Sequence, residues 1–350
     1  MSTGTPDHLP FLVADIGGTR TRFALCTGAG MVERISVAAT ADFPSIEHAI
    51  RHYLHEQGDP AVAGAVIGIA NPIVDDHVHM TNFSWSFSIS RTRDALGLGF
   101  LHVINDFTAL ALSVPALQAH ELQQVGGNEG IAQTPIGLIG PGTGLGVSAL
   151  IPVGDGRWVP LSAEGGHVSF APGNEQEQML WTRAHRQHGH VSMERLLSGA
   201  GLKFIYGALC QEQGITPRAY TPIDITANAL AGKDGLCTQA LDTFCTILGT
   251  AASDLAVTLG ARGGIYIGGG IVPKLGDYFV QSPFRQRFED KGRFSPYLAA
   301  IPVFVITSPY PALLGAAAYP GLLASTAGVE PPTPLTSSLS GRHPPPAPGQ

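Results

Sequence analysis

The fold of this chain is decided by the segment Leu12-Val13-Ala14-Asp15-Ile16-Gly17-Gly18-Thr19-Arg20-Thr21-Arg22-Phe23-Ala24-Leu25, which places an acidic residue and a Gly-Gly-Thr turn between two apolar, β-rich runs. Glycines in such a turn accept positive φ angles and let backbone N–H groups approach an anion closely. Asp15, at the end of a buried strand, is placed to hold a hydrated Mg²⁺. The segment therefore predicts a hairpin that grips phosphate, with an ordinary tight hairpin as the alternative.

A second glycine turn follows in the sequence Gly140-Pro141-Gly142-Thr143-Gly144-Leu145-Gly146. It also lies between two apolar runs, at 135–139 and 147–151. A P-loop would need a Gly-Lys-Ser/Thr ending and a Rossmann turn would need a helix directly after the glycines, so neither fold fits. Two Gly-Thr turns that each lead into β-type residues instead indicate a clamp on the phosphates of a nucleotide.

The composition favours a small-molecule partner. The net charge is −7, only 13% of the residues are charged, and the basic residues form no stripe or run. A nucleic-acid surface is therefore not expected. With 350 residues, 44% of them hydrophobic, the chain is long and apolar enough to fill the cores of two domains.

The cysteines and the N-terminal sequence point to a reduced, cytoplasmic protein. Cys26, Cys210, Cys237 and Cys245 are scattered and form no Cys-x-x-Cys pair, so neither a zinc site nor a disulfide framework is indicated. The first ten residues lack a basic region followed by an apolar one, and Gly, Pro or polar residues break the longest apolar stretches. We therefore expect no signal peptide and no membrane span.

The pattern of apolar residues predicts an α/β protein built in two parts. The first part is expected to follow the order βββαβαβα, with strands at 11–16, 21–27, 31–39, 61–70 and 100–104 and helices at 45–57, 90–96 and 105–114. The second part is expected to contain strands at 135–140 and 264–268, a hairpin around 154–156, several helices between 174 and 260, a strand at 302–306 and a helix at 311–324.

These elements give a provisional domain division. A small α/β domain is expected at 1–116, completed by about 303–324, and a large α/β domain at 117–302. The last segment, 325–350, is rich in Pro, Ser and Gly and has almost nothing apolar to bury, so we expect a disordered tail.

Asp106 is the strongest catalytic candidate. A single carboxylate where a strand turns into a helix can lie at the bottom of a cleft and accept a proton from a hydroxyl nucleophile. The alternative is that Asp106 merely caps its helix. The adjacent Asn105, which can hydrogen-bond to a sugar, favours the catalytic interpretation.

Two further segments carry polar or glycine-rich patterns that suit a ligand. Glu164-Gly165-Gly166-His167 can direct two polar side chains from one loop toward carbohydrate hydroxyls, and its metal-binding alternative supplies too few ligands. Gly268-Gly269-Gly270 follows an apolar strand, where bare backbone would let a ring or a ribose lie flat; a flexible turn is the alternative. Glu194 is also a candidate, although on the sequence alone it is equally an exposed helix carboxylate.

In this order, the motifs resemble the bacterial ATP-dependent glucokinases, a family of the sugar-kinase, actin and heat-shock-chaperone superfamily. The resemblance runs from about Phe11 to about Leu323 and is highly specific in combination. The matching motifs are Asp15-Ile-Gly-Gly-Thr19, Met80-Thr81-Asn82, Ile104-Asn105-Asp106-Phe107, Gly140-Pro-Gly-Thr-Gly-Leu-Gly146, Glu164-Gly-Gly-His167-Val-Ser-Phe-Ala-Pro172, Ser198-Gly199, Gly268-Gly-Gly-Ile-Val-Pro273, Phe288-Glu-Asp-Lys-Gly-Arg-Phe294 and Leu313-Leu-Gly315.

The resemblance implies a two-domain ribonuclease-H-like (actin-like ATPase) fold with a ligand cleft between a small and a large domain. It implies that Asp106 is the general base on the glucose 6-hydroxyl and that the sugar is bound by Asn105, Asp106, Glu164, His167 and Glu194. It also implies ATP and Mg²⁺ as cofactors, with one phosphate loop at Asp15, Gly17, Gly18 and Thr19, a second at Gly142, Thr143 and Gly144, and the adenosine side at Gly268, Gly269 and Gly270. A homodimer is the expectation at the level of the family.

Some positions depart from the family pattern. Arg20 stands where several members carry Asn, Asn71 stands where some carry Cys, and the Pro-rich tail lacks a counterpart. A related sugar-kinase family with a Cys-rich zinc motif is a poor match. A kinase for another hexose and a non-catalytic sugar sensor are the alternative functions; an actin-like filament or chaperone ATPase would have no use for Asn105, Glu164 and His167.

Overall fold

The computed structural model describes residues 9–27, 31–81 and 83–326 of the chain. Asn82 of the Met80-Thr81-Asn82 motif and nearly all of the predicted tail therefore lie outside the described residues. The last helix, α11 (Pro311–Thr326), continues two residues into the segment that the sequence predicts as tail.

The first part of the chain forms a five-stranded sheet in the order β3-β2-β1-β4-β7. Its strands are β1 (Phe11–Ile16), β2 (Arg20–Thr27), β3 (Met31–Ala39), β4 (Gly64–Ile69) and β7 (Phe100–Asn105). β1 pairs with β2 in antiparallel fashion and with β4 in parallel fashion. The predicted meander and the two later strands are thus confirmed, with ends that differ by a few residues.

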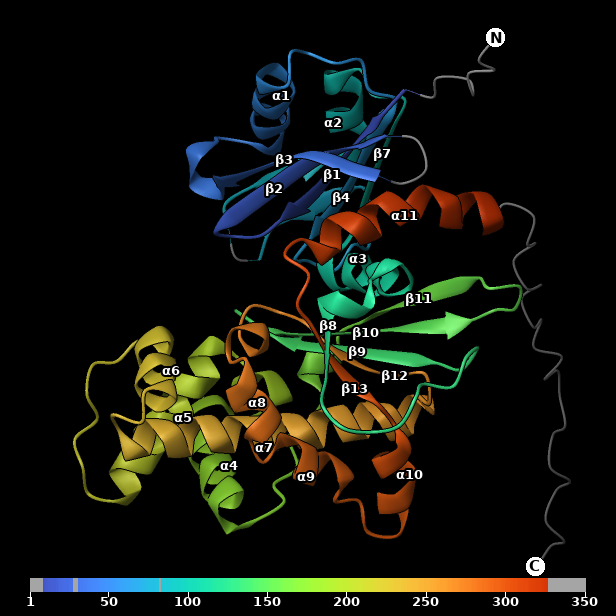
Figure 1. Cartoon of the computed structure of the whole chain (residues 1–350). Helices are drawn as coiled ribbons and strands as arrows, with labels where there is room; N and C mark the ends of the chain where they lie inside the picture. Colours follow the sequence, from blue (N-terminus) through green and yellow to red (C-terminus); the bar gives the residue numbers. More distant parts are fainter. Residues whose placement is uncertain (1–8, 28–30, 82, 327–350) are drawn as a thin grey trace, which may run out of the picture.

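Helices cover both faces of this sheet (Figure 1). α1 (Ile46–Glu56) and α2 (Ile89–Leu96) pack on one face, while α3 (Asp106–Ser113) and α11 pack on the other. A short hairpin, β5 (His77–His79) and β6 (Ser86–Ser88), is an addition to the predicted elements.

The second sheet has six strands in the order β11-β10-β9-β12-β13-β8. These are β8 (Leu122–Gln124), β9 (Ile136–Pro141), β10 (Leu145–Pro152), β11 (Trp158–Ala163), β12 (Gly264–Ile267) and β13 (Val303–Ile306). β13 pairs with β12 and β8 and so belongs to this sheet, whereas α11 returns to the first one. The chain thus crosses back after β13, and the prediction that residues 303–306 complete the small domain is wrong.

Helices pack beneath the second sheet (Figure 1). They are α4 (Glu175–His188), α5 (Gly199–Glu212), α6 (Pro222–Leu230), α7 (Gly235–Leu259), α8 (Asp277–Gln281), α9 (Phe284–Glu289) and α10 (Ser295–Ala300). Short 3-10 turns are η2 (Thr40–Asp42), η3 (Val114–Ala116), η4 (Ala119–Glu121), η5 (Gly165–His167), η6 (Met193–Arg195), η7 (Val272–Lys274) and η8 (Gly292–Phe294). α7 is long and apolar enough to cross a membrane, but 67% of its most apolar window is buried inside the protein, as in a core helix.

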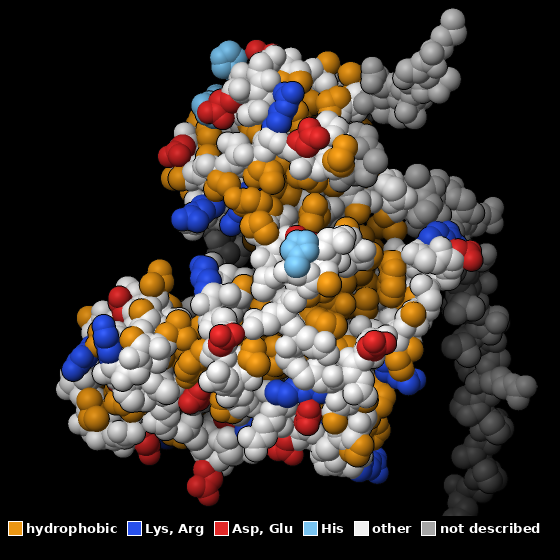
Figure 2. All heavy atoms as spheres, viewed as in Figure 1, with side chains coloured by type: hydrophobic (Ala, Val, Ile, Leu, Met, Phe, Trp, Pro, Cys, Tyr) orange, Lys and Arg blue, Asp and Glu red, His pale blue; other side chains and the backbone are white. Residues whose placement is uncertain are grey.

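α3 lies where the two sheets meet, and glycines make room for it. A Cβ on Gly146 of β10 would lie 1.9 Å from the ring of Phe107, and a Cβ on Gly268 would lie 2.5 Å from Leu110. On the other side, Gly315 of α11 is in direct backbone contact with α3. The N-terminus of α3 is therefore held between the two sheets, and Figure 2 shows the surface deeply notched between the two parts, with Lys and Arg side chains at the notch.

Candidate active site

Asn105, not Asp106, is the residue that caps α3. Asn105 Oδ1 accepts hydrogen bonds from the backbone N–H groups of Phe107 and Thr108, at 2.9 and 3.2 Å. Asp106 is the first residue of the helix, and its Oδ1 accepts a bond from Phe107 N at 2.9 Å. The cap is thus supplied by the neighbouring side chain, so capping alone does not explain an aspartate at position 106.

The charges of two other carboxylates act on Asp106 at the start of α3. Burial raises the pKa of Asp106 to about 6, and the negative charges of Asp15 and Glu164 contribute to that rise. These residues come from β1, from the segment after β11 and from the start of α3. A carboxylate with a pKa near neutral is well suited to accept a proton from a hydroxyl group.

Asp15 is paired with Arg22, a residue that the sequence analysis does not select. The two residues face each other in the antiparallel pairing of β1 and β2, and Arg22 Nη1 lies 2.6 Å from Asp15 Oδ2. Burial raises the pKa of Asp15, while the positive charge of Arg22 and its hydrogen bond oppose that rise. Counting residues across the predicted hairpin would have revealed the pair, because a tight turn fixes the register.

The first glycine turn is held by hydrogen bonds within its own hairpin and by hydrogen bonds from Thr40 of η2. Gly17 N donates to Arg20 O at 2.9 Å, Thr40 Oγ1 donates to Gly17 O at 2.7 Å, and Thr40 N donates to Thr19 O at 3.1 Å. The N–H groups of Gly18 and Thr19 make no hydrogen bond with another described residue, so both are available to an anion. The expectation of positive φ angles is wrong here, since neither Gly17 nor Gly18 has one; the glycines provide close access instead.

The second glycine turn is fastened at both ends. Gly142 N donates to Gly144 O at 2.8 Å, and Gly199 N, at the start of α5, donates to Gly142 O at 2.9 Å. Leu145 N donates to Glu194 Oε2 at 2.9 Å. Within the described part of the chain, the N–H groups of Thr143 and Gly144 have no partner, as in the first turn.

The triple glycine lies directly beside the second turn. Gly268 N donates to Ile139 O at 3.0 Å, and Ile271 N donates to Pro141 O at 3.3 Å. Gly269 has a φ of +81°, and a Cβ there would lie 2.5 Å from Pro141 O. The two segments are thus in backbone contact, and this approach is open only to glycine.

The Glu164–His167 segment and Glu194 are brought together by a short pairing of loops. Ser169 and Ser192 form an antiparallel bridge, and Met193 N donates to Val168 O at 2.9 Å. Glu164 and His167 are exposed, whereas Glu194 is half-buried. The structure therefore gathers all the predicted sugar-binding segments and the predicted phosphate loops around the start of α3.

Asn71, one of the two departures from the family pattern, connects the β5–β6 hairpin to this site. Its Nδ2 donates to His79 O at 2.6 Å, and its Oδ1 accepts from Thr81 N at 2.7 Å. Asn105 Nδ2 in turn donates to Asn71 O at 3.3 Å. The other departure, Arg20, is exposed at the start of β2, beside the first turn.

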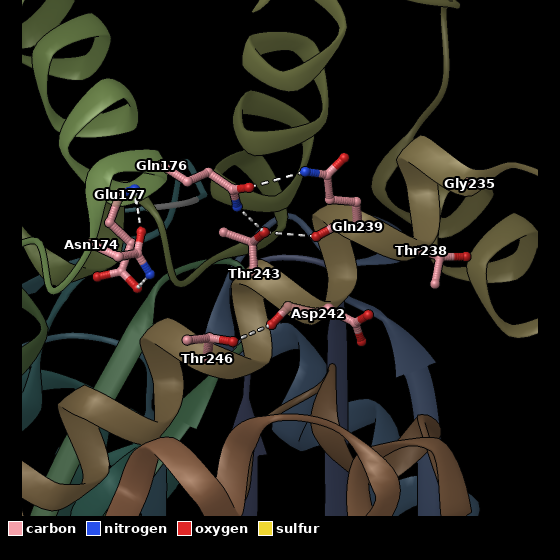
Figure 3. A pocket seen from close by; sticks show the side chains of 9 residues that line it. All are labelled: Asn174, Gln176, Glu177, Gly235, Thr238, Gln239, Asp242, Thr243 and Thr246. Carbon is pink, nitrogen blue, oxygen red and sulfur yellow. Dashed lines mark hydrogen bonds between the residues drawn. The ribbon is translucent and has the colours of Figure 1, made fainter. Parts of the chain in front are cut away.

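A cavity of about 370 Å³ lies elsewhere, bordered by α4 and α7. Figure 3 shows that its polar side chains bond to one another: Gln239 donates to Gln176, and Gln176 donates to Thr243. None of the candidate site residues lines it, so it is separate from the site at α3.

The described residues contain no group of three or more His, Cys, Asp or Glu side chains that could hold a metal ion. All four cysteines are buried, and none of them forms a disulfide in the structure. A cation at this site would therefore have to be held by few protein groups together with water and a ligand.

Comparisons with known proteins agree on one family. The family model described as Glucokinase matches residues 12–321. The chain is 55% identical to a glucokinase of Chromobacterium violaceum over 319 residues, which is 91% of each chain. It also matches the crystal structure of a glucokinase from an Antarctic psychrotroph, with a TM-score of 0.80 and 37% identity over 89% of this chain and 98% of the other.

A more distant structure shares the fold. The ROK-family glucokinase of Streptomyces griseus, solved in complex with glucose and AMPPNP, superposes with a TM-score of 0.60 at 22% identity, covering 89% of this chain and 98% of the other. The expected actin-like ATPase fold is therefore confirmed.

Proposed function

Because the chain belongs to the glucokinase family, we propose that it transfers the γ-phosphoryl group of ATP to the 6-hydroxyl of D-glucose, with Asp106 as the general base. The position of Asp106 is the observation that best supports its role as the general base. It is a partly buried carboxylate with a raised pKa at the N-terminus of a helix that both glycine-turn sheets contact.

The base acts on the sugar hydroxyl as it attacks. One oxygen of Asp106 accepts a bond from Phe107 N, which leaves the other free for a substrate hydroxyl. The 6-hydroxyl gives its proton to that oxygen while its own oxygen bonds to the γ-phosphorus, and the bond from the γ-phosphorus to the bridging oxygen of ADP breaks. The attacking and leaving oxygens lie roughly in line.

The sugar is held by the remaining polar groups. Asn105 is fixed by its capping bonds, so its side chain is already oriented before the sugar binds. Glu164, His167 and Glu194 supply further partners for hydroxyl groups, and two of these are carboxylates, which form strong hydrogen bonds with hydroxyl donors. We assign these four residues, with Asp106, to glucose.

The triphosphate lies between the two glycine turns. The N–H groups of Gly18 and Thr19 on one side, and those of Thr143 and Gly144 on the other, have no partner among the described residues and would bind its oxygens. Gly268, Gly269 and Gly270 continue from the second turn, where bare backbone would accept the adenosine. Backbone N–H groups that converge in this way form an anion site without needing a basic side chain.

Magnesium fits the residues at the first turn. Asp15 would hold it through water, because Arg22 occupies only one carboxylate oxygen and no cluster of three ligands exists in the described chain. Mg²⁺ usually keeps several waters and is held by one or two carboxylates together with substrate phosphates. When bound, it would neutralise charge on the β- and γ-phosphates.

The two parts of the chain supply the remaining features of the proposal. The small domain at 1–116, with the returning helix α11, and the large domain from 117 through β13 would close over the sugar and exclude water, so that the phosphoryl group does not pass to solvent. A cytoplasmic homodimer is the form we expect. Phosphorylation of another hexose is the alternative, since small changes in the same loops would alter specificity.

The direct test is the formation of glucose 6-phosphate by the purified protein with Mg²⁺-ATP and D-glucose, coupled to a dehydrogenase. A panel with mannose, fructose and glucosamine, run at equal concentrations, separates glucose from the other hexoses. Turnover that is fastest with glucose supports the proposal. Folded protein that turns over none of these sugars would contradict it and favour the sugar sensor.

A further inference from the structure

The two segments assigned to glucose, one with Glu164 and His167 and the other with Glu194, both contact the backbone of Leu145, the residue that follows the second glycine turn. Glu194 Oε2 accepts a hydrogen bond from Leu145 N at 2.9 Å. A Cβ on Gly166, in the Glu164–His167 segment, would lie only 2.2 Å from Leu145 O. Leu145 is therefore held at its N–H and approached at its C=O by the two segments assigned to glucose.

The carboxylate of Glu194 also touches the turn itself. A Cβ on Gly144 would lie 2.4 Å from Glu194 Oε2, which is closer than real Cβ contacts allow. Gly144 is thus the residue that lets this carboxylate reach the backbone. The other end of the turn is held by α5, where Gly199 N donates to Gly142 O at 2.9 Å. The unpaired N–H groups of Thr143 and Gly144 lie between these two fixed ends.

We propose that Glu194 is a positioning residue for the nucleotide phosphates, and that it couples the binding of sugar to the binding of ATP. This inference rests on the proposed function. One oxygen of Glu194 fixes the Leu145 N–H and thereby the direction of the free N–H groups at Thr143 and Gly144. The other oxygen has no hydrogen-bond partner among the described residues and is open to a sugar hydroxyl.

The physical basis is a shared carboxylate. A hydrogen bond to an ionised carboxylate is shorter and stronger than one between neutral groups, so it restrains the turn more than a neutral acceptor would. A sugar hydroxyl that donates to the free oxygen restricts the same side chain and hence the same turn. By linkage, the factor by which glucose tightens nucleotide binding must equal the factor by which nucleotide tightens glucose binding.

Binding measurements with each ligand alone test the proposal. The affinity of Mg²⁺-AMPPNP would be measured by calorimetry without glucose, in wild type, Glu194→Gln and Glu194→Ala. Loss of the acceptor in Glu194→Ala should weaken nucleotide binding roughly tenfold, and Glu194→Gln, which keeps an acceptor oxygen, should weaken it by less than about threefold. If Glu194→Ala binds the nucleotide as tightly as wild type, Glu194 serves the sugar alone and the proposal is overturned.

Gly144→Ala gives the reciprocal test. Its methyl group displaces the Glu194 carboxylate, which the turn and the sugar share, without replacing any side chain assigned to glucose, so glucose binding without nucleotide should weaken about fivefold or more. Unchanged glucose affinity would contradict the proposal. Glu129→Ala, at an exposed carboxylate before β9 whose neighbours Asn128 and Ile131 bond to Ala300 and Arg262, is the matched control and should leave both affinities unchanged.

The readouts separate this inference from the proposed function. Wild-type protein that binds neither glucose nor AMPPNP would overturn both. Wild-type protein that binds both, with nucleotide affinity insensitive to Glu194→Ala, would overturn only the coupling. Thermal unfolding midpoints of all variants would be compared, and the glucose affinity of Gly144→Ala decides the question if Glu194→Ala does not fold.

Discussion

Arg22 Nη1 lies 2.6 Å from Asp15 Oδ2, and the two residues are direct partners in the pairing of β1 and β2. The Asp15 side chain is 18% exposed, and the Arg22 side chain is 31% exposed. A carboxylate this far removed from water keeps its charge at lower cost when a cation touches it. Arg22 thus lowers the cost of ionising Asp15 before any metal arrives.

Replacing Arg22 by Met should therefore weaken the use of Mg²⁺-ATP. Without Arg22, the raised pKa of Asp15 rises further, and a protonated carboxyl group cannot hold a hydrated cation. We expect the KM for Mg²⁺-ATP to increase roughly tenfold near neutral pH and the defect to be smaller at a more alkaline pH, because a higher pH favours the ionised carboxylate. Arg22→Lys keeps a positive charge and should lose less; a defect equally large at both pH values would argue against this role of Arg22.

Asp106→Asn should remove most turnover while glucose still binds. The amide keeps the shape of the side chain and can still accept a bond from Phe107 N, but it cannot take a proton from the 6-hydroxyl. General bases contribute about 10²- to 10⁴-fold, so we expect a fall in kcat of that order. Steady-state kinetics measures this, and glucose should still raise the thermal unfolding midpoint of the variant. A variant with near wild-type kcat would remove Asp106 from the reaction.

The raised pKa of Asp106 also predicts two pH dependences. The base must be ionised, so kcat/KM for glucose should fall as pH decreases through about 6. The same shift destabilises the fold at high pH: the cost is absent below about pH 4, where the carboxyl group is protonated in both folded and unfolded chains, and it develops as pH rises from about 4 to about 6.

Chemical denaturation of Asp106→Asn at two pH values measures the second effect. The variant should be more stable than wild type by on the order of 2 kcal/mol at about pH 8 and show little difference at about pH 4. A stability difference of the same size at both pH values would mean that charge burial at Asp106 is not its cause.

Asn71→Ala should impair the site through the β5–β6 hairpin. Asn71 bonds to His79 O and Thr81 N, and its own carbonyl accepts from Asn105. Its loss removes the side-chain partner of two backbone groups in exposed residues, at a cost of about 0.5–1.5 kcal/mol for each hydrogen bond. We expect a lower unfolding midpoint and a higher KM for glucose, with little change in the KM for ATP. Asn71→Cys, the residue found in some family members, should be milder; an effect on ATP alone would contradict this assignment.

The strands and helices that can be predicted from the sequence are those with long apolar runs. β1 and β4 are continuous apolar runs next to glycine, and their pairing follows from burial on both faces. The β5–β6 hairpin escapes prediction because each strand has three residues and a single buried side chain, too few for a periodic signal. The sequence analysis assigns β13 to the wrong domain because an apolar strand of four residues fits either sheet. Only its pairing with β12 and β8 shows that it belongs to the second sheet.

The residues of the candidate site also differ in whether a local sequence pattern predicts them. The glycine turns and Asp106 can be predicted from the sequence because each lies at a junction between a strand and the element that follows it. Arg22 can be identified as the partner of Asp15 only when the register of β1 and β2 is known. The contact of Glu194 with Leu145 joins residues 49 positions apart. No local pattern encodes such a contact, since it depends on how η6 packs against the start of β10.

Gly146→Ala should lower turnover because Gly146 makes room for the ring of Phe107. A methyl group at this position would lie 1.9 Å from that ring, so the ring or the strand must move, and overpacking of this kind costs typically about 1–3 kcal/mol. Because Phe107 follows Asp106 directly, the displaced ring should also shift the base. We expect kcat, measured at saturating glucose and Mg²⁺-ATP, to fall about tenfold or more.

Gly207→Ala is the matched control for this displacement. Gly207 lies in α5, and apart from its chain neighbours and its own helix backbone no atom of the described residues lies within 4 Å of the position that a Cβ would take there. Alanine is also the better helix former, so the control should leave kcat unchanged and raise the free energy of unfolding by about 0.5–1 kcal/mol. If Gly146→Ala loses stability but keeps full kcat, then the packing of Phe107 supports the fold without setting the geometry of Asp106.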